Sequence, residues 1–299
     1  MAAVGSVRWA DEIIDGVTVH HRHVRGDGVD LHVAMAGDGP PVILLHGFPE
    51  NWRSWRKQIR TLVDAGLSVW MPDMRGYNWS ARPSSREAYH LRHLVADLAA
   101  LVCATGVPRA HVCGHDWGGI VAWTFAGHYP EQVDRLVICN APHLRLYAER
   151  VRRPPQLIMS WYVLFFQLPR VPELVLSLRD FRAVRAMFAA AHAAVGAFTT
   201  EEVDAYVRAL SAPGALTAAL DYYRANRDRQ AVAFGRSAVV RARTLVLWGV
   251  RDPALSVGLL DGLERVAPHL TVRRFPDVGH WIQNEAPGEV NAALVDFLT

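Results

Sequence analysis

Residues 110–119, Ala-His-Val-Cys-Gly-His-Asp-Trp-Gly-Gly, join an apolar run to a helical pattern through one sharp turn, which is the main indication of the fold. Gly114 and Gly118 stand two residues before and two residues after Asp116. Such a turn needs glycine there, since its central residue has a strained backbone and bulky neighbours would collide with it. The strain lifts the central side chain, here a carboxylate, above the sheet. An ordinary glycine turn fits these residues equally well, so the rest of the sequence must decide.

Apolar segments alternate along the chain around this turn. Short continuous runs are typical of buried strands, and longer runs with helical spacing are typical of helices packed on one side. We expect strands at residues 17–24, 29–36, 41–45, 67–71, 133–139, 244–248 and 270–275, and helices at 51–64, 91–105 and 287–298. Strands that alternate with helices predict a mostly parallel, doubly wound α/β sheet.

The alternation stops at about residue 143 and resumes at about residue 237. The residues between are rich in Ala, Leu and aromatic side chains, and their spacing indicates helices. These helices are expected at residues 154–167, 172–194, 200–210 and 214–226. We therefore predict an α/β core domain, residues 1–142 and 237–299, with a helical cap, residues 143–236, inserted in it.

Composition and charge exclude several classes of partner. The 299 residues carry a net charge of +3 and no run of Lys or Arg long enough to form a patch, so a nucleic acid is not expected. The uncharged run 154–169 is the longest candidate for a membrane span, but its 16 residues fall short of the roughly 20 that a spanning helix needs.

The N-terminus and the cysteines point to a cytoplasmic location. Residues 1–15 contain three acidic side chains and lack the apolar segment of a signal peptide. The three cysteines lie in apolar contexts, which favours reduced thiols in an intracellular compartment. The sequence is compatible with a homodimer but does not determine the oligomeric state.

Polar side chains follow the expected strands at the points where functional groups gather in a doubly wound sheet. Asp116 stands at the sharp turn, Asp252 follows the strand at 244–248, and His280 follows the strand at 270–275. A lone Asp after a strand is most often a turn residue, and a lone His is most often structural. Together, nucleophile, acid and histidine have the chain order of the α/β-hydrolase triad.

With these motifs the sequence resembles the α/β-hydrolase superfamily and, within it, the epoxide hydrolases that use an aspartate nucleophile. The resemblance covers nearly the whole chain. It rests on His-Gly-Phe-Pro at 46–49, Asp-Met-Arg-Gly-Tyr-Asn-Trp-Ser at 73–80, Gly-His-Asp-Trp-Gly-Gly at 114–119 and Gly-His-Trp at 279–281. In the cap, Trp-Tyr-Val-Leu-Phe-Phe-Gln-Leu-Pro at 161–169 and Tyr-Tyr-Arg-Ala-Asn at 222–226 resemble the segments that carry the family's paired tyrosines.

The resemblance implies a hydrolase acting on ether bonds, which opens a small apolar epoxide to a vicinal diol and serves in detoxification. Asp116 would attack an epoxide carbon and form a covalent ester. Water activated by His280 would hydrolyse this ester, with Asp252 orienting the imidazole. The paired tyrosines, Tyr162 and Tyr223 by this resemblance, would protonate or hydrogen-bond the epoxide oxygen; Tyr222 is the alternative to Tyr223.

The resemblance also assigns roles around the nucleophile. The backbone N–H groups of Phe48 and Trp117 would form the oxyanion hole. Neither a cofactor nor a metal is implied, and the expected partners are the epoxide and water. The residues expected to line the substrate pocket are Trp117, Trp161, Phe165, Phe166 and Trp281.

Other functions share this fold. A haloalkane or haloacid dehalogenase uses the same Asp nucleophile, but relatives of that kind often have Asn in place of Phe48 and Trp in place of Tyr162. A serine esterase is disfavoured because Asp116 stands at the nucleophile position. A non-catalytic binding protein would usually have lost a member of the triad, and all three are present here. Asn140 stands where some relatives carry the acid, but an amide cannot act as one, which favours Asp252.

Overall fold

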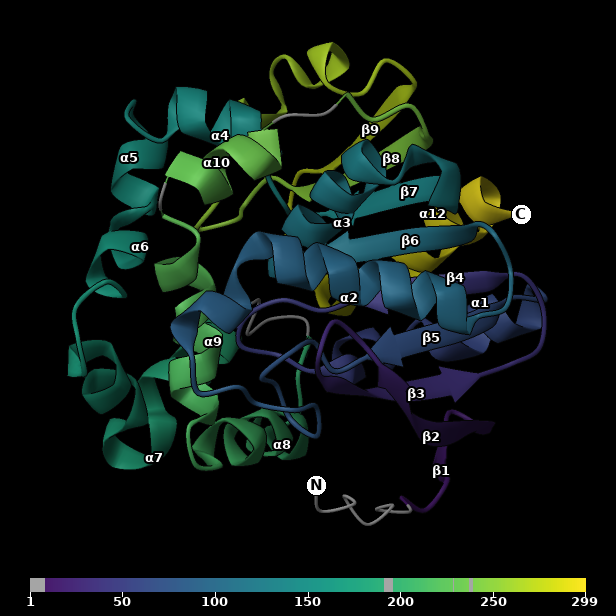
Figure 1. The fold of residues 1–299 in the computed structure, drawn as a ribbon, viewed down its shortest axis with the longest axis horizontal. Helices are drawn as coiled ribbons and strands as arrows, with labels where there is room; N and C mark the ends of the chain where they lie inside the picture. The colour runs from purple at the N-terminus through teal and green to yellow at the C-terminus, as the bar shows by residue number, and fades with distance from the viewer. Residues whose placement is uncertain (1–8, 191–195, 228, 237–238) are drawn as a thin grey trace.

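One twisted sheet lies at the centre of the computed structural model, which describes residues 9–190, 196–227, 229–236 and 239–299 (Figure 1). Its strands are β1 (Glu12–Ile14), β2 (Val17–Arg25), β3 (Asp30–Ala36), β4 (Pro41–Leu45), β5 (Ser68–Pro72), β6 (Ala110–His115), β7 (Val133–Cys139), β8 (Arg243–Gly249) and β9 (Leu270–Phe275). Strands β1, β2, β3 and β5 pair antiparallel in that order, whereas β5, β4, β6, β7, β8 and β9 are parallel neighbours. The expected, mostly parallel α/β sheet is confirmed.

The parallel strands end together at one edge of the sheet. Leu45 of β4 is in register with Gly114 of β6, and His115 of β6 is in register with Cys139 of β7. Strand β4 has β5 on one side and β6 on the other, so the chain winds in opposite directions from it. Crevices that bind ligands form beyond the strand ends at such a point.

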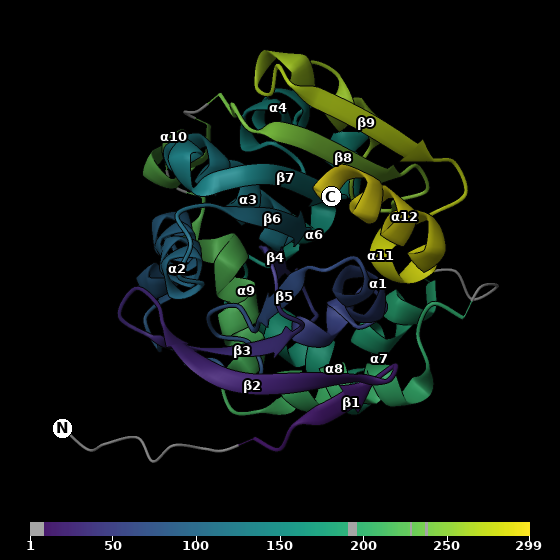
Figure 2. The same ribbon diagram turned by 90° about the vertical axis from the view of Figure 1, so that its right-hand side faces the viewer.

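Helices cover both faces of the sheet (Figure 2). The helices of this part are α1 (Ile59–Asp64), α2 (Leu91–Ala104), α3 (Trp117–His128), α11 (Ile282–Glu285) and α12 (Pro287–Leu298). Short 3-10 helices lie at Trp52–Trp55, Arg86–Tyr89, Pro130–Gln132, Val257–Leu260 and Leu263–Arg265. Helices α2 and α3 pack in one apolar cluster, and α1, α11 and α12 pack in a second cluster on the opposite face.

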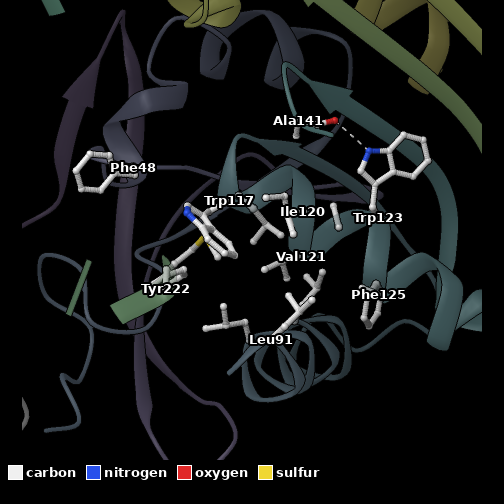
Figure 3. Packing of buried hydrophobic residues seen from close by; sticks show 14 of the residues in the cluster. Phe48, Leu91, Trp117, Ile120, Val121, Trp123, Phe125, Ala141 and Tyr222 are labelled. Carbon is white, nitrogen blue, oxygen red and sulfur yellow. Dashed lines mark hydrogen bonds between the residues drawn. The ribbon is translucent and has the colours of Figure 1, made fainter. Parts of the chain in front are cut away.

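Helix α3 is buried on nearly all sides, which a helix with apolar residues all round requires. Ile120 and Val121 belong to the same apolar cluster as Leu91 at the start of α2 (Figure 3). On another side of the helix, the Trp123 indole N–H donates a 3.2 Å hydrogen bond to the carbonyl oxygen of Ala141. The core therefore fixes the helix that follows the sharp turn.

Between β7 and β8 the described residues form helices and no strand. These helices are α4 (Leu144–Arg150), α5 (Gln156–Met159), α6 (Trp161–Phe165), α7 (Val171–Ala190), α8 (Thr200–Ser211), α9 (Ala215–Ala225) and α10 (Arg229–Arg236). Figure 1 shows α5, α6, α7, α8 and α9 beside the edge at which the parallel strands end. This segment therefore stands next to the residues that follow those strands.

The turn between β6 and α3 has no room for side chains at its glycines. Asp116 has φ 50° and ψ −120°, a left-handed conformation that costs a non-glycine residue about 1–3 kcal/mol. A Cβ atom on Gly114 would lie 2.4 Å from the carbonyl oxygen of Gly118, and one on Gly118 would lie 2.3 Å from that of Leu45. The two glycines thus let β4, β6 and α3 close around Asp116.

Three predicted helices differ from the structure. The helix expected at 51–64 is a 3-10 turn followed by α1, and the helix expected at 154–167 is divided at Ser160 into α5 and α6. The helix expected at 172–194 is α7, whose backbone is not helical at residues 178–181; residues 191–194 lie outside the described residues. Hydrophobic periodicity also did not predict β1, α4 or α10.

The break in α7 separates two halves that pack differently. Before it, Leu174 and Val175 are exposed although Leu176 is buried, whereas after it Val184 and Phe188 are buried. The continuous helical pattern of the sequence does not show this difference. Periodicity reveals which residues share a face but not which way that face points.

We predict that Gly118→Ala destabilises the protein by about 3 kcal/mol or more, because the new Cβ meets the backbone of Leu45 and His46 and cannot be relieved by a rotamer change. Gly288→Ala in α12 is the matched control. A Cβ there meets nothing within 4 Å, so its effect should be neutral or slightly stabilising. Urea unfolding measures both, and equal stability of Gly118→Ala and the wild type would show that the turn tolerates a side chain.

Candidate active site

Asp116, directly after β6, is held by the loop that follows β4. The backbone N–H of Phe48 donates a 2.8 Å hydrogen bond to Oδ1. Gly47 packs so closely that a Cβ atom on it would lie 2.4 Å from the Asp116 Cβ. The second predicted donor, the N–H of Trp117, is in the first turn of α3, where N–H groups have no partner within the helix. The other carboxylate oxygen, Oδ2, faces His280, whose Nε2 is 3.8 Å away.

His280 lies between two carboxylates, those of Asp116 and Asp252. Its Nδ1 is 2.7 Å from Oδ2 of Asp252. The other oxygen of Asp252 accepts hydrogen bonds from the N–H groups of Ala254 and Leu255, at 2.7 and 2.9 Å. Because Nδ1 donates to Asp252, Nε2 is the nitrogen that faces Asp116 and is left for proton transfer.

Asn140, directly after β7, is hydrogen-bonded to the carboxylate of Asp252. Its Nδ2 donates to Oδ2 of Asp252 at 2.7 Å and to the carbonyl oxygen of Gly249 at 3.2 Å. Its Oδ1 accepts from the N–H of Gly249 at 2.8 Å. The amide of Asn140 therefore holds the Asp252 carboxylate in place beside His280.

The charges of the site shift two pKa values in opposite directions. Burial would lower the pKa of His280, but the carboxylates of Asp252, Asp116 and Glu50 outweigh it and raise the pKa to about 9. Burial would raise the pKa of Asp252, but His280 and the hydrogen bonds from Ala254 and Asn140 lower it. The resting site therefore favours a protonated imidazole beside an ionised Asp252.

Tyr162 of α6 and Tyr223 of α9 come together above the turn. Their ring centroids are 5.9 Å apart, and the ring of Tyr223 lies 5.8 Å from that of Phe48 and 5.1 Å from that of Trp117. Burial, and next the negative charge of Asp116, raise the pKa of both phenols well above the ordinary value. Both hydroxyls thus remain protonated in the field of the Asp116 carboxylate.

Tyr222 occupies a different place from Tyr223. Its hydroxyl donates a 2.7 Å hydrogen bond to the carbonyl oxygen of Arg75, and its ring contacts those of Tyr77 and Tyr89. The side chain is fully buried in the core. The hydroxyl of Tyr222 is already engaged with the backbone, so this geometry favours Tyr223 as the second cap tyrosine.

The predicted pocket residues fall into two groups. Trp117, Phe166 and Trp281 are buried, and the rings of Phe166 and Trp281 lie 5.0 Å from Tyr223 and 5.2 Å from His280. Phe165 is partly buried, with its ring 5.9 Å from that of Phe166. Trp161 is not brought into this group, since 64% of its surface is exposed. The reason is that α6 turns Tyr162 inwards, which leaves the preceding residue on the outside.

A buried pair behind His280 was not predicted from the sequence. His115 contacts Glu50 through Nδ1 at 3.1 Å, and its Nε2 lies 2.9 Å from the backbone carbonyl oxygen of His280. Glu50 also accepts a 2.7 Å hydrogen bond from Ser54. Both side chains are fully buried, so the pair anchors the loop that carries His280. The Glu that follows His-Gly-Phe-Pro is the sequence feature that could have indicated this pair. Its partner, His115, is 65 residues away in the sequence, so the pairing could not be predicted.

Two further features concern metals and membranes. Within the described ranges, no group of three or more His, Cys, Asp or Glu side chains is placed to hold a metal ion. No helix in that part of the chain has both the length and the apolar composition to cross a bilayer. The uncharged run 154–169 includes α5 and α6, which have four and five residues.

Comparison with known proteins gives a consistent result. Residues 40–287 match the family model of the alpha/beta hydrolase fold. The chain is 39% identical to the AB hydrolase superfamily protein YfhM of Bacillus subtilis, over 95% of this chain and 99% of that protein. It is 37% identical to epoxide hydrolase 3 of Xenopus tropicalis, over 94% of this chain and 79% of that protein.

Solved structures agree with these matches. The crystal structure of an epoxide hydrolase from Bacillus megaterium in complex with an inhibitor superposes with a TM-score of 0.85. It is 30% identical in sequence and covers 93% of this chain and 99% of its own. At this level of identity the likeness extends beyond the shape of the sheet to the sequence itself.

We predict that protonation of His280 stabilises the folded protein, and that this stabilisation is lost as the pH rises from about 6.5 to about 9. A histidine titrates near 6.5 when unfolded and near 9 here, so the folded state holds a proton that the unfolded state has lost. This stabilisation is fully present below pH 6.5, is lost as the pH rises through about 9, and amounts to at most about 3 kcal/mol. Urea unfolding of the wild type and His280→Gln across this pH range measures it.

The control for this measurement is His20→Gln, because the side chain of His20 is 65% exposed. This variant should retain the pH dependence of the wild type, whereas His280→Gln should lose most of it. An identical slope of stability against pH in the wild type and His280→Gln would contradict the prediction.

Proposed function

The chain belongs to the α/β-hydrolase fold family and, within it, to the epoxide hydrolases, and from this premise we propose that it hydrolyses an apolar epoxide to a vicinal diol. The relatives named above support a hydrolase that acts on epoxide ether bonds. The chemistry that we propose adds a covalent ester on Asp116 and water activated by His280 and Asp252. The observation that carries it is the placement of a carboxylate and two protonated phenols around one site.

In the first step, Asp116 attacks an epoxide carbon and the ring opens to leave an ester on the enzyme. Oδ1 accepts the N–H of Phe48, so Oδ2, which faces His280, is the oxygen available for attack. The opening oxygen needs a proton or strong hydrogen bonds, since an alkoxide is a poor leaving group. Tyr162 and Tyr223 supply them, and such acid assistance typically contributes about 10²- to 10⁴-fold.

In the second step, His280 removes a proton from water, and the resulting hydroxide attacks the ester carbonyl of Asp116. Esterification removes the charge of Asp116, one of the influences that raise the pKa of His280. The imidazolium therefore loses its extra proton more easily, and this proton returns to the phenolate that ring opening leaves on a tyrosine. Asp252 stabilises the imidazolium that forms again. The oxyanion develops on Oδ1, where the N–H groups of Phe48 and Trp117 stabilise it, each donor contributing roughly 3–4 kcal/mol. Its collapse breaks the ester C–O bond, and the leaving alkoxide takes the proton of the new carboxyl, which releases the diol and restores the Asp116 carboxylate.

The same proposal includes the organisation of the chain. Residues 1–142 and 237–299 form the core that carries Asp116, Asp252 and His280, and residues 143–236 form the cap that carries the tyrosines. The haloalkane or haloacid dehalogenase alternative is less well supported, because two phenols suit an epoxide oxygen and no Asn stands at the position of Phe48. A cytoplasmic location and a homodimer stay predictions from the sequence.

We predict that His280→Gln completes the first step and blocks the second, because Asp116 and the tyrosines are unchanged while the base is absent. Intact-mass spectrometry after mixing with styrene oxide should show an adduct with the mass of the epoxide. In the wild type, styrene oxide should yield diol and a bromoalkane should yield no halide.

The control is the double variant Asp116→Asn/His280→Gln, which should form no adduct. Styrene oxide consumed by His280→Gln without any adduct would rule out the covalent route. Halide release by the wild type without diol formation would instead assign the site to a dehalogenase.

We predict that Tyr162→Phe/Tyr223→Phe slows ring opening by about 10²-fold or more, because the epoxide oxygen loses both donors. Single-turnover consumption of the epoxide measures this step. Tyr222→Phe is the matched control: it should cost about 1 kcal/mol of stability through its lost hydrogen bond to Arg75 and leave ring opening near the wild-type rate. The opposite ranking of Tyr222→Phe and Tyr223→Phe would mean that Tyr222 is the donor.

A further inference from the structure

Large apolar side chains are exposed in one continuous part of the cap, helices α5 to α7. Between 40% and 70% of the surface of each is accessible. They are Leu157, Ile158, Trp161, Leu164, Leu168, Val171, Leu174, Val175 and Leu178. Figure 1 shows α5, α6 and α7 in a column along one edge of the molecule. We call these nine side chains the α5–α7 surface; single exposed apolar residues are ordinary, but a cluster of this size marks an interaction site.

The first half of α7 shows that this exposure is built into the fold. Four of the exposed residues, at positions 171, 174, 175 and 178, have the spacing of one helical face. The opposite side of this helix carries Glu173, which forms two hydrogen bonds of 2.6 and 2.9 Å with the buried guanidinium of Arg224. Because this ion pair fixes the rotation of the helix, the apolar face points to the outside.

Helices α5 and α6 have the same reversed arrangement. The amide of Gln156 is buried and bonds with the backbone of Ala254 and Ser256, while the next two residues are exposed. On α6, Tyr162 and Phe166 turn towards the site, and the residues beside them, at 161 and 164, turn outwards. Contacts with the rest of the protein therefore hold the inner side of each helix, and apolar groups cover its outer side.

The charges around the α5–α7 surface are positive. Five arginines between residues 152 and 182 are exposed, and none of them forms an ion pair within the described residues. They are Arg152, Arg153, Arg170, Arg179 and Arg182. The two acidic residues of this stretch, Glu173 and Asp180, are paired with Arg224 and Arg185. The apolar side chains thus have a rim with an excess of positive charge.

We propose that the α5–α7 surface docks the protein on the surface of an anionic lipid bilayer. Apolar side chains that sink into the headgroup region, with arginines around them for acidic lipids, are what binding in the plane of a membrane requires. A second copy of this chain is a less suitable partner for the α5–α7 surface. A two-fold contact would place the positively charged rims of the two copies against each other. The α5 and α6 helices are far too short to span a bilayer, so the contact is peripheral.

This contact has a consequence that rests on the proposed function. An apolar epoxide partitions into lipid, so an enzyme held at the bilayer meets its substrate at a higher local concentration. The short helix α6 presents Tyr162 to the site and Leu164 to the outside, which places the docking surface next to the tyrosine pair. The docking itself does not depend on the reaction.

Co-sedimentation with vesicles of phosphatidylglycerol and phosphatidylcholine in equal amounts tests the proposal. The wild type should bind these vesicles more tightly than vesicles of phosphatidylcholine alone, and about 0.5 M NaCl should weaken the binding. Ile158→Gln/Leu174→Gln should reduce the affinity at least about tenfold, because two buried apolar contacts are lost. Arg153→Gln/Arg182→Gln should reduce it about 25-fold, at roughly fivefold for each arginine.

The matched control is Ile13→Gln, since Ile13 is 78% exposed and lies on β1, away from the α5–α7 column in Figure 1. It should bind vesicles like the wild type, and all variants should hydrolyse a water-soluble epoxide at the wild-type rate. No binding by the wild type, or equal binding by the wild type and Ile158→Gln/Leu174→Gln, would overturn the proposal.

Light scattering tests whether a second copy of the chain, and not a bilayer, binds the α5–α7 surface. A wild-type dimer that Ile158→Gln/Leu174→Gln converts to a monomer, without vesicle binding, would assign the surface to a second copy and overturn lipid docking. Because vesicle binding is measured without turnover, its failure leaves the proposed hydrolase activity untouched. Conversely, a protein that binds vesicles but hydrolyses no epoxide would refute only the proposed function.

Discussion

The close contact of three backbone segments around Asp116 positions the sheet, helix α3 and the candidate active site. Cβ atoms on Gly114 and Gly118 would meet carbonyl oxygens at 2.4 and 2.3 Å, and one on Gly119 would meet the Cβ of Ala141 at 2.3 Å. These contacts hold Asp116 in a conformation that a free chain would leave. The burial of α3 on nearly all sides supplies the stability that offsets this strain.

Around this turn, buried charged and polar side chains contact one another in sequence, and each one fixes the position of the next. His280 is held from one side by Asp252, which Asn140 and two backbone N–H groups hold in turn. From behind, His115 contacts the backbone of His280 and is paired with Glu50. Three carboxylates in reach of one imidazole explain why its pKa is raised although it is buried.

In the proposed cap, helices α5 to α7 direct several polar groups inwards and nine large apolar side chains outwards, although others, such as Leu176 and Phe188, are buried. Its phenols and the ion pair of Glu173 with Arg224 face inwards, while the α5–α7 surface is apolar and points outwards. Under the proposed function, the phenols face inwards because a reacting epoxide oxygen needs hydrogen-bond donors opposite the Asp116 carboxylate. The outward side has no such explanation within a single chain, and for that reason a bilayer is the partner that we infer.

The sequence by itself determined the elements whose signals are local. The glycines around Asp116, the continuous apolar strands and the order of Asp116, Asp252 and His280 predicted the α/β fold, since strand ends in a parallel sheet meet at one edge. Other features could not be predicted, because they depend on contacts between residues that are distant in the sequence. The hydrogen bond of Tyr222 to Arg75 separated it from Tyr223, the Glu50–His115 pair joined two motifs, and the exposure of Trp161 followed from the rotation of α6. Periodicity gives the face of a helix, but only packing determines where that face points.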